Sequence, residues 1–264
     1  HTAANYGAAL QSYALQRALT EHGFDNLYLD YQNMSRKHEY DMMFHIVDSL
    51  NHKKWLSALA YTLGTPFMEL RKYRFDKFYK ANLKKTHKMY KSSDEAKEAN
   101  SLFDKFIVGS DQVWNTVVCG EIDPVYFLSF LPKKVKKIAY AASFGGASVE
   151  EKNKTRIKSW LEEYDKVTIR ENSGIKIASE LGIHAEQVLD PTFLLDKNEW
   201  EKLIPNRKCD EKYVLVYQLH PNKQFDAYAK EFAKRKGLKL YRVSHCFHHI
   251  CLLYTSPSPR DLST

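Results

Sequence analysis

Short apolar runs alternate with helical segments along this chain, and that alternation constrains the fold more than any other feature. The apolar runs that are typical of buried strands lie at residues 105–109, 137–146, 167–170 and 188–191. Helical periodicity occupies residues 149–164 and 172–181 between them. Strands that alternate with helices at this spacing predict an α/β fold with a parallel sheet, of the Rossmann-like kind.

The first thirty residues predict the back half of a βαβ unit. Residues 8–21 form a helical stretch with Leu10, Ala14 and Ala18 on one apolar row. A glycine follows as a helix stop, and residues 27–31 are typical of a strand. Because the chain starts at His1, the first strand of this unit is expected to precede it, which makes the sequence a fragment.

The remaining segments divide the chain into an N-terminal α/β domain at residues 1–200 and the start of a second at 211–250. Residues 33–100 are expected to be mostly helical, and the charged residues 196–210 are expected to be a linker. The second domain is predicted to be cut short, because about forty residues are too few for a complete one. Its elements are a strand at 213–217, a helix at 222–236 and a strand at 238–243. Residues 251–264 predict a non-native or disordered tail.

A cluster of polar residues follows the apolar run Phe106-Ile107-Val108 directly. After Gly109 come a hydroxyl, a carboxylate, an amide, an indole and a second amide, at Ser110, Asp111, Gln112, Trp114 and Asn115. In open α/β sheets, ligands bind at the carboxyl ends of the strands, so this cluster stands where a ligand is expected. The alternative is a polar turn that caps the next helix, with Trp114 in the core.

Composition excludes several classes of protein. No apolar run approaches the roughly 18 residues that a membrane-spanning helix needs. The 4 cysteines, at positions 119, 209, 246 and 251, are too few for a disulfide framework and favour a reducing cytoplasm. Neither a Walker loop nor a G-x-G-x-x-G motif occurs, which argues against nucleotide triphosphatases and dinucleotide enzymes.

Basic residues are concentrated in one segment. The formal net charge is +8, and residues 71–91 have nine Lys and Arg against the single acid Asp76. One interpretation is attraction to an anion, such as a phosphorylated substrate, a lipid surface or nucleic acid. The other, which we favour, is a solvated helix face with Tyr73, Phe75, Phe78 and Tyr79 packed inward. No nucleic-acid-binding motif accompanies the charge, so no nucleic-acid partner is expected.

Six ordered segments of the chain together resemble the polysaccharide pyruvyl transferase family. They are the opening His1 with residues 5–15, residues 106–115, Tyr126-Phe127-Leu128, residues 139–145, Ile169-Arg170-Glu171 and residues 188–192. The resemblance covers roughly residues 1–220. It implies two Rossmann-like domains facing a cleft, as in glycosyltransferases of the B type, of which this chain holds the first and part of the second.

The resemblance implies transfer of an enolpyruvyl unit from phosphoenolpyruvate to a sugar, forming a ketal across two hydroxyls. The chemistry demands no redox cofactor or metal, and the acceptor would be a sugar or a lipid-linked oligosaccharide of a surface polysaccharide. The family's later arginine/histidine segment, where donor-phosphate ligands and the catalytic acid are expected, is not found, so the chain as given is expected to be inactive. The enzyme would be cytoplasmic, associated peripherally with the inner face of the membrane. No oligomeric state is indicated.

Candidate site residues follow from what the reaction needs. Asp111 at a strand end is the candidate catalytic base or sugar-hydroxyl acceptor. The N-terminus of the first helix, with Asn5, could bind an anion, or Asn5 could simply cap the helix. Arg170 could pair with the donor or with a structural carboxylate such as Glu171 or Asp190. The other candidate substrate-binding residues are Tyr6, Gly7, Gly109, Ser110, Gln112, Asn115, Ser143, Gly145 and Glu171.

Other assignments are weaker. Asp190-Pro191 favours a turn at the domain junction. The histidines and cysteines at 245–251 match no standard zinc spacing, so no metal is expected. A glycosyltransferase of the same architecture that uses a nucleotide-sugar, and a sugar- or phosphate-binding module without catalysis, remain the alternatives.

Overall fold

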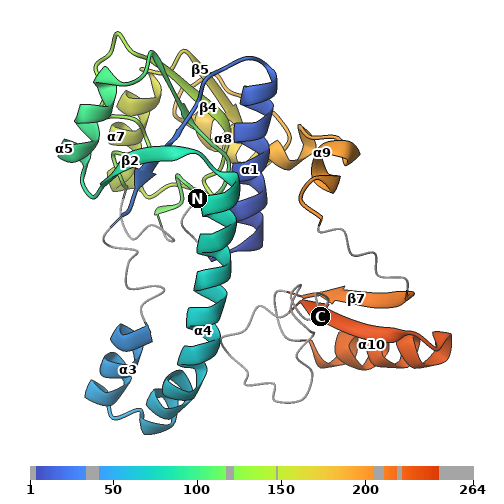
Figure 1. The fold of residues 1–264 in the computed structure, drawn as a ribbon. Coiled ribbons are helices and arrows are strands. Elements are labelled where there is room, and N and C mark those ends of the chain that lie inside the picture. The colour runs from blue at the N-terminus through green and yellow to red at the C-terminus, as the bar shows by residue number, and fades with distance from the viewer. Residues whose placement is uncertain are drawn as a thin grey trace. The chain divides into compact units, whose positions relative to one another are not determined.

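A computed structural model describes residues 4–33, 42–116, 122–146, 148–204, 211–218 and 222–243 (Figure 1). These residues belong to two compact units, one ending at Asp196 and the other starting at Lys197. All four cysteines, the 245–251 segment and the tail lie outside the described residues. Among the helices that are described, none combines the length and apolar character needed to cross a bilayer.

The first unit is built on a four-stranded sheet. Its strands β3 (Lys105–Val108), β4 (Lys136–Ala142), β5 (Lys166–Ile169) and β6 (Glu186–Gln187) are adjacent in chain order, and every neighbouring pair is parallel. This confirms a mixed α/β protein with a parallel sheet. Because all four strands run the same way, their carboxyl ends meet at one edge.

Two helices form the crossovers of this sheet. α7 (Glu151–Leu161) connects β4 to β5, and α8 (Asn172–Glu180) connects β5 to β6. Each helix buries its apolar face, with Ile157, Leu161 and Ile177 at most 2% exposed. These boundaries agree with the predicted helices to within a few residues.

The predicted strand at 188–191 is wrong in its placement. β6 ends at Gln187, and only Val188 adds one more backbone bond, to the carbonyl of Ile169 at 3.0 Å. Pro191 has no N–H to donate to a ladder, and it begins the 3₁₀ helix η3 (Pro191–Phe193) instead. Asp190 caps that turn by accepting from the Thr192 amide at 3.0 Å.

Residues 33–100 are mostly helical where they are described, as expected, but they also contain a strand that was not expected. β1 (Tyr28–Tyr31) pairs in parallel with β2 (Lys85–Tyr90), and the helices α3 (Met42–Asn51) and α4 (Trp55–Asn82) lie between them in the chain. A short helix α5 (Ser93–Ala96) and the 3₁₀ helix η2 (Lys97–Ser101) follow. β2 was hidden in the basic segment because only two of its six side chains are buried.

The helix α1 (Tyr6–Glu21) buries polar side chains as well as apolar ones. Ala14 and Ala18 are buried as predicted, but Leu10 is 38% exposed, which corrects its assignment to the apolar row. Gln16 occupies the buried face because its amide donates to the Lys84 carbonyl at 2.9 Å and accepts from the Lys84 amide at 2.7 Å. This pair fixes α1 against the start of β2.

The prediction that the aromatic residues of the basic segment pack inward is correct only in part for helix α4. Phe75 and Tyr79 are buried and Phe78 is partly buried, whereas Tyr73 is 55% exposed. Phe78 lies against Tyr13 of α1, with ring centroids 6.4 Å apart. The aromatic side chains therefore hold α4 to α1, but one of them faces solvent.

An aromatic group anchors the core beneath the strand ends. Trp114 is 1% exposed, stacks on Phe127 at 5.5 Å between centroids and lies 5.1 Å from Phe144. Its indole N–H donates to the Tyr126 carbonyl at 3.1 Å. Trp114 is thus a core residue that holds the loop after β3 in place.

The second unit consists of α9 (Lys197–Glu201), β7 (Tyr213–Tyr217), α10 (Lys223–Lys236) and β8 (Lys239–Val243). β7 and β8 are parallel, and Gly237 ends α10 with φ +63°. These elements stand where the strand, helix and strand were expected. The residues taken for a linker begin with the helix α9, and the assignment of 211–250 to a truncated domain stays a prediction.

Candidate functional site

Polar side chains from four strand ends gather at the carboxyl edge of the main sheet. Ser110 follows β3, Ser143 follows β4, Arg170 follows β5 and Asp190 follows β6. Their adjacency is a consequence of the parallel order of the strands rather than of closeness in the sequence. This edge is where ligands bind in open α/β sheets.

Asp190 connects three of these strand ends. Its Oδ2 accepts from Ser110 Oγ at 2.8 Å and from Arg170 Nη1 at 3.1 Å, and its Oδ1 accepts from the hydroxyl of Thr192 at 2.8 Å. Burial raises the pKa of the Asp190 carboxyl, but the hydrogen bonds from Thr192, Ser110 and Arg170 together outweigh burial, so its pKa lies below the ordinary value. Asp190 is therefore a charged group that positions Arg170, and not only a turn residue.

Glu171 forms a second connection, between the ends of β4 and β5. Its Oε1 accepts from Ser143 Oγ at 2.9 Å and from the Phe144 amide at 3.1 Å. Although Glu171 occupies the N-cap position of α8, its side chain makes no cap bond to that helix. The N-terminus of α8, with its partial positive charge, is left without a side-chain cap beside Arg170.

Gly145 lets the loop after β4 approach the loop after β3. It has φ +65°, and a Cβ there would lie 2.4 Å from Asn115 Nδ2 and 2.8 Å from Gln112 Cδ. The Asn115 amide in turn donates to Gln112 Oε1 at 2.9 Å. Only glycine has the space and the backbone freedom that this approach requires.

A hollow of about 390 Å³ opens at this edge. Its lining residues are Gln112, Ser143, Gly145, Gly146, Arg170, Glu171 and Ser173. A guanidinium, hydroxyls, glycine backbone and the uncapped start of a helix are groups that bind a small anion with carboxylate or phosphate oxygens. Glu171 adds a carboxylate whose Oε2 lies 3.9 Å from Arg170 Nε, so part of the guanidinium charge is balanced within the site.

Asp111 lies in this region in an unusual backbone conformation. Its φ is +90°, and it forms an isolated parallel bridge with Ala142 beyond the end of β3. Its Oδ1 accepts from the Gln112 amide at 2.8 Å. Positive φ at a non-glycine residue is costly, and such residues concentrate at functional sites. Asp111 does not itself line the hollow, and its catalytic role stays a prediction.

The candidates on α1 are placed differently. Asn5 caps the helix, with its Oδ1 accepting from the Gly7 amide at 2.8 Å and the Ala8 amide at 3.3 Å. Tyr6 lies against Phe75 of α4, with centroids 5.1 Å apart. None of these residues lines the hollow, so the structure does not bring Asn5, Tyr6 and Gly7 together with Arg170. Their role in binding remains a prediction.

Sequence reasoning missed two residues near this edge, Gln11 and Ser173. Gln11 lies where Gly109 packs against α1: a Cβ on Gly109 would lie 3.0 Å from Leu15 Cδ2 and 3.9 Å from Gln11 Oε1. Gln11 is 7% exposed, and its Oε1 has no hydrogen-bond partner within the described part of the chain. Ser173 lines the hollow from the first turn of α8. An amide in an apolar helical row was the only available signal for Gln11.

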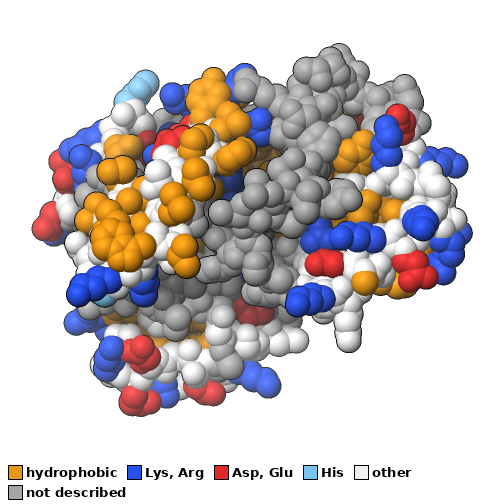
Figure 2. All heavy atoms as spheres, turned by 90° about the horizontal axis from the view of Figure 1, so that it is seen from below, with side chains coloured by type: hydrophobic (Ala, Val, Ile, Leu, Met, Phe, Trp, Pro, Cys, Tyr) orange, Lys and Arg blue, Asp and Glu red, His pale blue; other side chains and the backbone are white. Residues whose placement is uncertain are grey.

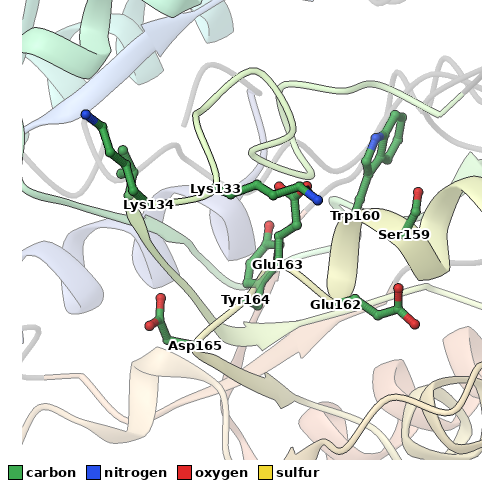
Figure 3. Close-up of a pocket in the computed structure, with 9 residues that line it drawn as sticks. Lys133, Lys134, Ser159, Trp160, Glu162, Glu163, Tyr164 and Asp165 are labelled. Atoms are coloured by element: carbon green, nitrogen blue, oxygen red, sulfur yellow. The ribbon is translucent and has the colours of Figure 1, made fainter.

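A larger hollow of about 600 Å³ lies at the opposite edge, by the amino ends of β4 and β5 (Figure 3). There Lys133 and Glu163 point toward each other, with Nζ and Oε1 3.9 Å apart. Glu163 also receives a 2.6 Å bond from the fully buried Lys137, whose Nζ donates to the Leu131 carbonyl at 3.2 Å. The buried charges here satisfy one another, and ligands in parallel sheets bind at the other edge. We therefore place the candidate site at the carboxyl ends.

Among the described residues, no group of three or more His, Cys, Asp or Glu side chains is arranged to hold a metal ion.

Comparison with known proteins agrees with the resemblance drawn from the six segments. No curated protein and no solved structure matches the chain. A family model described as polysaccharide pyruvyl transferase matches residues 5–263, which is nearly the whole sequence. The chain therefore belongs to the polysaccharide pyruvyl transferase family.

Proposed function

We propose that this protein transfers an enolpyruvyl group from phosphoenolpyruvate to a sugar of a surface polysaccharide, closing a pyruvate ketal across two hydroxyls. Family membership supports a pyruvyl transferase in general. The observation that supports this donor is the hollow where Arg170 and the uncapped N-terminus of α8 are found together. Phosphoenolpyruvate brings both a carboxylate and a phosphate, which these groups would recognise.

Donor binding would use groups that the fold already holds in place. Asp190 orients the Arg170 guanidinium through its 3.1 Å contact, so little side-chain entropy is lost when a ligand arrives. Gly145 and Gly146 allow close approach to the backbone, and Ser173 adds a hydroxyl from the first turn of α8. The donor would sit with an anionic group over that helix end.

We assign Asp111 as the base that activates the acceptor sugar. The first sugar hydroxyl loses its proton to Asp111 and bonds to C2 of the donor while the vinyl carbon C3 gains a proton. The bond from C2 to the phosphate oxygen then breaks, and a second hydroxyl takes that place. One hydroxyl proton ends on the new methyl group and the other on inorganic phosphate, so atoms and charge balance.

The activity is tested on the product of the full-length gene, by phosphate release from phosphoenolpyruvate with and without an added polysaccharide acceptor. We expect release that depends on the acceptor, together with a ketal methyl signal in the NMR spectrum of the glycan. Turnover with a nucleotide-sugar alone would contradict the proposal and indicate a glycosyltransferase. Binding of phosphoenolpyruvate without turnover of any acceptor would instead support a binding module.

Donor binding is tested with Arg170→Ala by isothermal titration with phosphoenolpyruvate. Loss of a hydrogen bond to a charged group is worth about 1.5–3 kcal/mol, so we expect affinity to fall roughly 10- to 100-fold. The matched control is Arg156→Ala, which removes a guanidinium that lies 6.0 Å over the ring of Trp160, on α7. Equal affinities for the two variants would remove Arg170 from the donor site.

A further inference from the structure

Large apolar side chains form an exposed row along α4. They recur three or four residues apart, which places them on one face of the helix. The members and their exposed fractions are Leu56 (85%), Leu59 (57%), Leu63 (61%), Phe67 (72%) and Leu70 (40%). Glu69 is the only charged residue from Trp55 to Leu70. Leu56 and Leu70 are fourteen residue steps apart, so the row extends over about 21 Å.

α3 adds a second exposed row to the same structure. Met43, Val47 and Leu50 are 65%, 48% and 40% exposed and follow helical spacing. α3 packs on α4, where His45 stacks on Tyr61 with centroids 5.5 Å apart. We call residues 42–82 the α3–α4 hairpin. Figure 2 shows hydrophobic side chains gathered over it, with Lys and Arg at the margin.

Lysines stand at both ends of the apolar rows. Lys53 and Lys54 occupy the turn between the two helices, and Lys72, Lys77 and Lys80 follow the row on α4; all five are exposed. Within the ranges that the structure describes, none of these five ammonium groups has an acid partner. Over the whole hairpin, seven Lys and Arg face three acids. Trp55 is 66% exposed at the start of α4, between the turn lysines and the row.

We propose that the α3–α4 hairpin docks on an anionic lipid surface, with its apolar rows inserted at the level of the headgroups. Helices that lie in the membrane interface have this composition: Trp, Phe and Leu on one face and Lys or Arg around it. Large apolar side chains that gather on one exposed surface mark an interaction site. The hairpin shares no residue with the strand-end site, and the proposal does not rest on the transfer reaction.

The lysines around the apolar rows favour an anionic lipid surface over a second copy of the chain as the partner of the hairpin. A two-fold pairing of the apolar rows would bring an identical set of unpaired lysines to the same interface. Anionic headgroups instead supply the opposite charge, and each lysine near such a surface adds to binding. The lipid surface is therefore the occupant that satisfies both the apolar rows and the cations around them.

The test is co-sedimentation of the purified chain with phosphatidylcholine vesicles that do or do not contain phosphatidylglycerol. We expect binding to the anionic vesicles, weaker binding at raised salt and a blue shift of Trp fluorescence that Trp55→Phe reduces. The double variant Leu63→Glu, Phe67→Glu should bind about tenfold more weakly or not at all. The control is Leu102→Glu, which adds a carboxylate at a 58% exposed leucine outside the hairpin.

Circular dichroism of each variant separates lost binding from lost folding, because both altered side chains are exposed. Unchanged vesicle binding by the folded double variant would overturn the proposal. So would a wild-type chain that ignores anionic vesicles, or one that forms a dimer which the double variant disrupts. The last result would assign the apolar rows to a second copy.

Discussion

Two residues of the strand-end site hold backbone conformations that most residues avoid. Asp111 has φ +90° and Gly145 has φ +65°, and they lie in the loops that follow the adjacent strands β3 and β4. At Gly145 the approach of Asn115 and Gln112 leaves no space for a Cβ. At Asp111 a side chain is kept despite the cost, and the carboxylate bonds to the next amide at 2.8 Å. Glycine would adopt this φ at a lower energetic cost, so the presence of a carboxylate here supports a catalytic role for Asp111.

Gly145→Ala should be strongly destabilising. The new methyl group would overlap Asn115 and Gln112 and would also be held at positive φ, so we expect a loss of about 1–3 kcal/mol from overpacking in addition to backbone strain. The control is Gly182→Ala, which has a similar φ of +74° but whose nearest atom is Lys158 Nζ at 3.6 Å. Urea unfolding of both variants measures the difference. Equal losses would show that overlap contributes nothing.

Asp111→Ala should abolish transfer while leaving the fold intact. Removal of a general base typically costs 10²–10⁴-fold in rate. Among the described residues, the hydrogen bond to the Asp111 side chain is a local one, from the Gln112 amide. Asp111→Asn keeps the oxygen that accepts the Gln112 amide but cannot take a proton at neutral pH. We therefore expect both variants, made in the product of the full-length gene, to lack phosphate release and to melt near the wild-type temperature. Full activity in either would exclude Asp111 as the base.

At the scale of secondary-structure elements, the site is a set of strand ends held together by side chains. Asp190 joins the ends of β3, β5 and β6 through Ser110 and Arg170, and Glu171 joins the ends of β4 and β5 through Ser143. β6 has only two residues, so side-chain bonds supply much of what fixes it there. Stability of this edge should therefore depend on the charge of Asp190.

The pH dependence of stability tests this dependence. Because folding lowers the pKa of Asp190, its carboxylate contributes stability that is present above the unfolded-state pKa, near 3.9, and is lost as the pH falls through the folded-state pKa. We expect Asp190→Asn to lose about 1–3 kcal/mol at neutral pH and to show a shallower loss of stability in acid. Urea midpoints between about pH 7 and pH 3 measure both effects.

Asp94→Asn is the matched control for that experiment. The pKa of Asp94 is also lowered, by its hydrogen bond from Lys97, but this pair is exposed on the surface. Exposed ion pairs contribute little to folding, so we expect no appreciable change in its urea midpoint. An acid slope in Asp190→Asn that matches the wild type would show that Asp190 does not connect these elements energetically.

At the scale of the whole molecule, the described candidate site residues all belong to one unit. Residues 5–7 and 109–190 provide them, and the unit continues to Asp196. A chain that ends at Asp196 should unfold cooperatively near the temperature of the intact chain and should retain affinity for phosphoenolpyruvate. Calorimetry and titration check the two expectations. Loss of binding by a folded, truncated chain would show that the second unit supplies part of the donor site.

Sequence reasoning succeeded where one local pattern decides the structure. The runs at 105–109, 137–146 and 167–170 became β3, β4 and β5, because apolar β-forming stretches between helical segments have few other solutions. It failed at β2 and at Leu10. β2 includes Lys85 and Lys88, and only Thr86 and Tyr90 of its six residues are buried, so its strand character arises from pairing with β1.

The site was predicted as a set of residues but not as an arrangement. Ser110, Ser143 and Arg170 were identified from their positions after strands, whereas Asp190 was assigned to a turn and Gln11 was not considered. Asp190 does cap a turn through Oδ1, yet its Oδ2 accepts a 2.8 Å hydrogen bond from the hydroxyl of Ser110, eighty positions away. A contact over that separation leaves no trace in either local pattern.

By itself, the sequence determined the α/β class, the sequence positions of the main strands and the polar residues that follow them, since periodicity and turn chemistry are local properties of the chain. Only the tertiary structure decided which of those polar residues meet. It placed Arg170 between Asp190 and Glu171, turned the α3–α4 hairpin's apolar rows outward and left the N-terminus of α8 uncapped. The physical reason is that strand order and helix packing set these distances, and both depend on contacts between residues far apart in the chain.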